Sequence, residues 1–168
     1  FCNDSEGFAI YAAGYTGNEI GATNSNKLVG TAASNNAVIE TGTATGPVGD
    51  DDISNWAMKL SVVSSPTPTY PITIDSAPNV SGGANASFSD YHTVPNGYTK
   101  VAHRDSGTDI GQSAEGATLN TTYAAYISKT QPADTYSGQV IYTLVHPSDH
   151  AKPIANPATL DTGQTVTS

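Results

Sequence analysis

Hydrophobic and polar residues alternate in several short segments of this chain. The clearest segment is 55–64, which reads Asn-Trp-Ala-Met-Lys-Leu-Ser-Val-Val-Ser. Successive side chains of a strand point to opposite faces, so this alternation predicts a half-buried strand. Its inner face would carry Trp56, Met58, Leu60 and Val62. Lys59 falls on the opposite face, and we expect it to face solvent.

Other segments of strand length are separated by glycine, proline, asparagine and serine, the residues that favour turns. They are 7–15, 27–31, 37–43, 72–74, 98–104, 121–128 and 138–146. In 140–145 both alternating sets are largely apolar, which predicts a central strand covered on both faces. The stretch 75–90, rich in small polar residues, is expected to be an exposed loop. No segment has the periodicity of a helix.

These short strands at regular spacing predict an all-β fold, namely an antiparallel, immunoglobulin-like β-sandwich of about seven or eight strands. The length of 168 residues fits one domain. We assign residues 1–147 to a single β-sandwich domain. Residues 148–168 contain Pro153 and Pro157 and are expected to be a linker or an assembly tail.

Charge excludes several classes of partner. The chain has 6 Lys and Arg against 15 Asp and Glu, a net charge of −9, and only 12% charged residues. Without a basic cluster it cannot neutralise a nucleic-acid backbone. No apolar run is long enough to predict a membrane span. The composition favours an extracellular or cell-surface protein. Cys2 is the single cysteine, either a partly buried thiol or one that pairs with another chain.

Asp50, Asp51 and Asp52 form the densest charge in the chain and are the candidate metal ligands. Carboxylate oxygens are what Ca²⁺ binds, although the regular spacing of a calcium loop is missing here. The alternative is a solvated acidic turn. We expect no other cofactor.

Histidines do not form a pattern that predicts catalysis. His146 and His150 are four residues apart, but Pro147 forbids the helix that would bring them together. His103 near Asp105 could belong to a hydrolytic triad with Ser113, yet the strand–turn–helix setting of such a serine is missing. We therefore expect the protein not to be an enzyme.

Tyrosines near expected turns are candidate glycan contacts, because flat rings stack on sugar faces. They are Tyr70, Tyr91, Tyr98 and Tyr136. The alternative is that they lie at the rim of the core. Asn79 and Asn85 begin Asn-x-Ser/Thr triplets and are the best candidates for glycosylation.

The segment 131–144 reads Gln-Pro-Ala-Asp-Thr-Tyr-Ser-Gly-Gln-Val-Ile-Tyr-Thr-Leu. It resembles the Gln-Pro-Ala-Gly-Thr-Tyr turn and following strand of bacterial surface β-sandwiches of the pilin, spore-coat-U and immunoglobulin-like kinds, with Asp134 in place of the usual glycine. Segments 7–12 and 54–60 and the His146-Pro147 ending strengthen the resemblance to repeat modules of bacterial cell-surface proteins. The resemblance implies a structural or adhesive role and no catalytic residues.

These observations favour an extracellular structural protein, a subunit of a pilus-like filament (a homopolymer) or a module of an adhesin. It would associate with itself or with neighbouring modules through strand edges or terminal segments. The candidate assembly residues are Phe8, Ile10, Tyr11, Leu160 and Val166. The alternative is a carbohydrate-binding module of a secreted protein.

Overall fold

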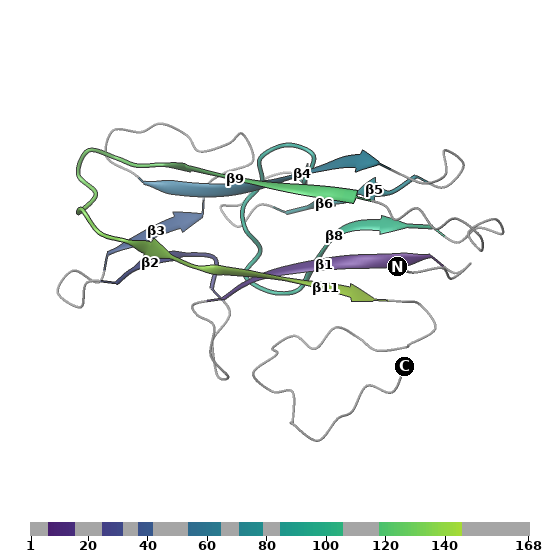
Figure 1. Ribbon diagram of the computed structural model, residues 1–168, viewed down its shortest axis with the longest axis horizontal. Helices are drawn as coiled ribbons and strands as arrows, with labels where there is room; N and C mark the ends of the chain where they lie inside the picture. Colours follow the sequence, from purple (N-terminus) through teal and green to yellow (C-terminus); the bar gives the residue numbers. More distant parts are fainter. Residues whose placement is uncertain are drawn as a thin grey trace, which may run out of the picture.

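The computed structural model describes residues 7–15, 25–31, 37–41, 54–64, 71–78, 85–105 and 118–145. All regular elements in these ranges are strands, so the all-β prediction is confirmed. The same ranges contain no helix that could cross a membrane. Figure 1 shows β4 and β9 in an upper layer, above β8, β1 and β11.

The first sheet has four strands in the order β11-β1-β8-β5. Strand β1 (Phe8–Tyr15) pairs antiparallel with both β11 (Gln139–Val145) and β8 (Thr99–Arg104). The short strand β5 (Thr73–Ile74) pairs with β8 at the other edge. This sheet therefore joins strands from both ends of the described chain.

The second sheet has five strands in the order β10-β2-β3-β4-β9. Its longest ladder joins β4 (Asn55–Ser64) to β9 (Thr118–Tyr126), which run antiparallel. Strands β2 (Leu28–Gly30), β3 (Val38–Thr41) and β10 (Tyr136–Ser137) complete it. Strands β3 and β4 run parallel.

A third, small unit is the two-stranded sheet of β6 (Ser76–Ala77) and β7 (Ala86–Ser87). The stretch 75–90 was expected to be a loop, and that prediction is wrong for these strands. They form because they pack at the core: Ala77 is buried, and Phe88, directly after β7, is completely buried. The backbone also ties the unit to β4, since Leu60 donates its N–H to the carbonyl of Phe88 at 2.7 Å.

One hydrophobic core is shared by the two larger sheets, as in a β-sandwich. Strand β4 contributes Trp56, Met58 and Leu60, as its alternation predicted. Ala12 of β1 and Val101 of β8 face them from the other sheet. The prediction was wrong for Val62, which is exposed, because β4 extends past the core at this end. Lys59 is half-buried, with its ammonium 5.9 Å from the centroid of the Tyr91 ring.

Polar groups at the core margin are held by specific hydrogen bonds. The indole N–H of Trp56 donates to the carbonyl of Asn26 at 2.7 Å, so the buried ring keeps its polar atom paired. Asp134 accepts from the hydroxyl of Thr31 at 3.0 Å and from the backbone N–H of Thr135 at 2.7 Å. Through these two hydrogen bonds, its carboxylate links the turn before β10 to the end of β2.

The prediction that 140–145 is a central strand is wrong. Strand β11 ends its sheet among the described residues, and its only ladder is the one with β1. Tyr142 and Leu144 are exposed. Apolar residues on both faces of a segment indicate a preference for burial, but they do not specify which strand gains a second neighbour. Strand β1 lies inside this sheet instead, between β11 and β8, and its residues 12–15 are buried.

The core position of Leu60 leads to a stability prediction. Leu60 is 2% exposed, so Leu60→Ala should lower the free energy of unfolding by roughly 2–5 kcal/mol through lost burial and a residual cavity. Val63 of the same strand is 58% exposed, and Val63→Ala should change it by less than about 0.5 kcal/mol. Urea unfolding followed by circular dichroism measures both. Equal losses in the two variants would contradict the described inner face of β4.

Candidate functional site

The most distinctive surface feature is the side of the sandwich between β9 and β11, here called the open side. Partners in an antiparallel ladder point to the same face of a sheet. Tyr123 is paired with the buried Met58, and Tyr142 with the buried Ala12, so both tyrosines belong to the inner, core-facing surfaces. Both are nevertheless exposed. The inner faces therefore reach solvent along this side.

Exposed hydrophobic side chains gather at the open side. Of the seven large ones in the described ranges, four lie on β9 or β11 or directly after β9. They are Tyr123, Ile127, Tyr142 and Leu144. A concentration of this kind on a surface indicates an interaction site.

The two strands that border the open side carry no charge. Strand β9 reads Thr-Leu-Asn-Thr-Thr-Tyr-Ala-Ala-Tyr and β11 reads Gln-Val-Ile-Tyr-Thr-Leu-Val. Among the described residues each pairs with one neighbour only, β4 and β1 respectively. Natural edge strands are commonly protected from pairing with other chains by lysine, proline or bulges. Lysine and proline are missing from both strands.

Tyr123 and Tyr142 bridge the two sheets at the open side. Their hydroxyl oxygens are 2.8 Å apart, within hydrogen-bonding distance. The ring of Tyr123 also stacks on Trp56, with centroids 6.0 Å apart and an interplanar angle of 29°. Partial burial raises the pKa of the Tyr123 phenol well above its ordinary value, and the hydrogen bond with Tyr142 raises that pKa further.

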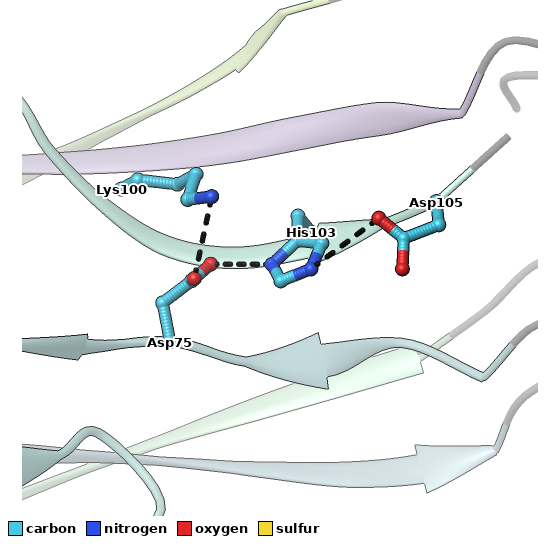
Figure 2. Close-up of polar contacts among 4 residues, drawn as sticks. All are labelled: Asp75, Lys100, His103 and Asp105. Carbon is cyan, nitrogen blue, oxygen red and sulfur yellow. Dashed lines mark hydrogen bonds and ion pairs between the residues drawn. The ribbon is translucent and has the colours of Figure 1, made fainter.

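A second polar feature is the cluster around Asp75, shown in Figure 2. His103 Nδ1 is 2.8 Å from one Asp75 oxygen, and Lys100 Nζ is 3.4 Å from the other. His103 Nε2 lies 3.6 Å from Asp105. Both ring nitrogens thus face carboxylates, whereas a catalytic triad needs one of them to face a nucleophile. Asp75 also pairs its backbone with Val101 and Phe88, so the cluster ties the β5–β6 region to β8.

A third feature is a cavity of about 330 Å³ beside the β6–β7 unit and the turn before β8. Its walls include His92, Asn96, Tyr98 and Thr99. Both nitrogens of the buried His92 ring are engaged: Nε2 is 2.9 Å from the carbonyl of Ala77, and the Thr93 hydroxyl is 3.1 Å from Nδ1. His92 therefore has a structural role, and the polar groups left for a ligand come from the other walls.

The predicted assembly residues and the predicted glycan-binding tyrosines do not form a common site in the described part of the structure. Phe8, Ile10 and Tyr11 lie in β1, a strand that pairs with β11 on one side and with β8 on the other, so deleting β1 would remove an interior strand of this sheet. Tyr91, Tyr98 and Tyr136 are all half-buried. Tyr136 packs against the core and donates its hydroxyl to the carbonyl of Pro132 at 2.8 Å.

Asn85 is exposed just before β7, an accessible position for a glycosylation acceptor. The remaining predicted residues lie outside the described ranges. They are Cys2, Asp50, Asp51, Asp52, Tyr70, Asn79, Ser113, His146, His150, Leu160 and Val166. Within the described ranges no three His, Cys, Asp or Glu residues are grouped in a way that could hold a metal ion.

The sequence did not lead us to predict the exposed residues of the open side. Tyr123, Ile127, Tyr142 and Leu144 look like core residues in the sequence, because each lies in an apolar, strand-forming segment. Their exposure depends on which strands end each sheet. The signal that was available is the lack of any charged residue in 118–126 and 139–145, which leaves these strands without the usual protection of an edge.

Comparison of the chain with protein-family models, with curated proteins and with solved structures finds no match.

The raised pKa of Tyr123 predicts a dependence of stability on alkaline pH. Because the folded state holds the phenolic proton more tightly than the unfolded chain, unfolding above pH 10 releases a proton. This contribution is fully present below about pH 10 and declines as pH rises towards the higher folded pKa. Urea unfolding between neutral pH and about pH 11 should show a shallower decline for Tyr123→Phe than for wild type. The control Val63→Ala should keep the wild-type slope, and an unchanged slope in Tyr123→Phe would contradict the assignment.

Proposed function

We propose that the protein is an extracellular structural protein with an immunoglobulin-like β-sandwich, a subunit of a surface filament or a module of an adhesin, that associates with further copies of itself through β9. The observation that carries this proposal is the open side, with its uncharged strands and its exposed hydrophobic side chains. Strand β9 is the longer of its two bordering strands, with nine residues, and among the described residues it pairs only with β4, so its other edge can take a second chain. Backbone hydrogen bonds along such an edge give affinity without a dedicated pocket.

Charge supports a second copy as the occupant of this edge. At a net charge of −9, two copies repel each other over most approaches. Strand β9 and the neighbouring β11 carry no acidic residue, so two copies can meet there without placing carboxylates opposite one another. Pairing of β9 with β9 closes a two-fold dimer, whereas pairing of β9 with a different edge of the next copy is head-to-tail and extends into a polymer.

A charged residue on β9 tests this proposal. Asn120 is exposed on β9, directly opposite the exposed Ser61 of β4. Asn120→Lys places an ammonium on the edge strand and should shift concentrated protein from oligomers to monomers, because a charged side chain on an edge strand opposes its pairing with another chain. Ser61→Lys adds the same charge on the same face of the inner strand and should leave oligomers intact. Light scattering and negative-stain microscopy measure the outcome.

Wild-type protein that stays monomeric at all concentrations would contradict the proposal. So would equal disruption by the two lysine variants, since that would indicate a general effect of charge and not a β9 contact.

The cavity beside Tyr98 favours a second candidate function, a carbohydrate-binding module. Its volume of about 330 Å³ suits a small sugar unit, and its walls combine an aromatic ring with the amide of Asn96 and the hydroxyl of Thr99. Tyr98 is held against the buried Tyr15 at a centroid distance of 6.5 Å, so its ring has a defined position.

Glycan binding at this cavity predicts a specific loss. Tyr98→Ala should reduce binding to any glycan found on an array by at least about tenfold, because a stacking ring and its area are lost. Tyr91→Ala changes a half-buried tyrosine outside the cavity and should retain binding. A wild-type protein that binds no glycan, or equal losses in the two variants, would exclude this second function.

A further inference from the structure

The two tyrosines of the open side lie close enough for their rings to react with each other. Tyr123 belongs to the five-stranded sheet and Tyr142 to the four-stranded sheet, and their hydroxyl oxygens are 2.8 Å apart. They are 46% and 39% exposed, so small oxidants can reach both rings. The reactive ring carbons of a phenol are those next to the carbon that bears the hydroxyl. The contact therefore brings the reactive edges of two phenols together.

We propose that Tyr123 and Tyr142 form an oxidative cross-linking site, at which peroxide and a peroxidase join the two rings as dityrosine. Each phenol gives up one electron and one proton and becomes a phenoxyl radical. The two radicals combine through a carbon–carbon bond between ring positions next to the hydroxyls. The hydrogens on those carbons then move to the oxygens and restore both aromatic rings. Overall, two phenols and one hydrogen peroxide give one dityrosine and two water molecules.

The surroundings of the pair favour this reaction over radical loss to other sites. Trp56 stacks on Tyr123 and is 6% exposed, so an oxidised indole can take an electron from Tyr123 and pass the oxidation to the tyrosine pair while water is kept from the indole. The Tyr123–Tyr142 hydrogen bond holds the second phenol in place when the first is oxidised. The hydrogen bond also gives the departing phenolic proton an acceptor.

A cross-link here would close the open side covalently. The two residues are 19 positions apart in the chain and lie in different sheets, so the bond would tie β9 to β11. A chain with one cysteine cannot form an internal disulfide, and this bond would supply the corresponding constraint on the unfolded state. The inference does not depend on self-association, because both tyrosines are in one molecule.

The test treats the full chain, at low concentration, with hydrogen peroxide and a peroxidase. Wild-type protein should lose the mass of two hydrogen atoms while remaining monomeric, and should gain the fluorescence of dityrosine. Trypsin cuts after Lys129, between the two tyrosines, so the product should appear as two joined peptides in mass spectrometry. The thermal unfolding midpoint of the cross-linked protein should rise by at least about 5 °C.

Conservative variants separate this site from general tyrosine oxidation. Tyr123→Phe and Tyr142→Phe remove single hydroxyls and should each abolish the cross-linked peptide, with folding checked by circular dichroism. Tyr126→Phe, on the same strand, should retain it. A cross-link that persists in Tyr142→Phe, forms equally in urea-unfolded protein, or joins mainly separate molecules would overturn the proposal.

Discussion

The structure depends above all on burial of the inner face of β4. Trp56, Met58 and Leu60 fill the space between the two larger sheets, where they meet Ala12 and Val101. The position of Trp56 is fixed further by its hydrogen bond to Asn26. Tyr123 stacks on that ring and reaches Tyr142 in the other sheet, so the geometry of the open side follows from the packing of the core.

Strands β9 and β11 end the two larger sheets in the described part of the chain, although their apolar residues favour burial. This difference has functional consequences. Strands β1 and β4 have neighbours and buried inner faces, whereas β9 and β11 end the described sheets with inner-face side chains in solvent. A β-sandwich with such a margin can reduce its exposed apolar area by adding a strand from another chain or by a bond across the margin. The proposed self-association and the proposed dityrosine are these two routes.

Much of the local structure could be predicted from the sequence. The alternation in 55–64 predicted β4 at its observed bounds, the alternation in 98–104 located β8, and the apolar run in 7–15 located β1, because each of these patterns is a local property of the chain. The small strands β6 and β7 could not be found this way, since their pairing depends on contact with β4 and β8. The Asp75–His103 contact was equally hidden, because 28 positions of chain separate the two residues. The acidic triplet Asp50–Asp52 remains a prediction.

The amino-acid pattern alone is enough to predict that this chain forms strands, that its surface is polar but weakly charged, and that no basic or long apolar segment is present. The folded structure was needed to learn that 139–145 lies at the end of its described sheet and 8–15 inside it, and that Tyr123 contacts Tyr142. The physical reason is that hydrophobic pattern reports how strongly a side chain favours burial. Sheet order, which sets whether that burial is achieved, comes from hydrogen bonds between segments far apart in the chain.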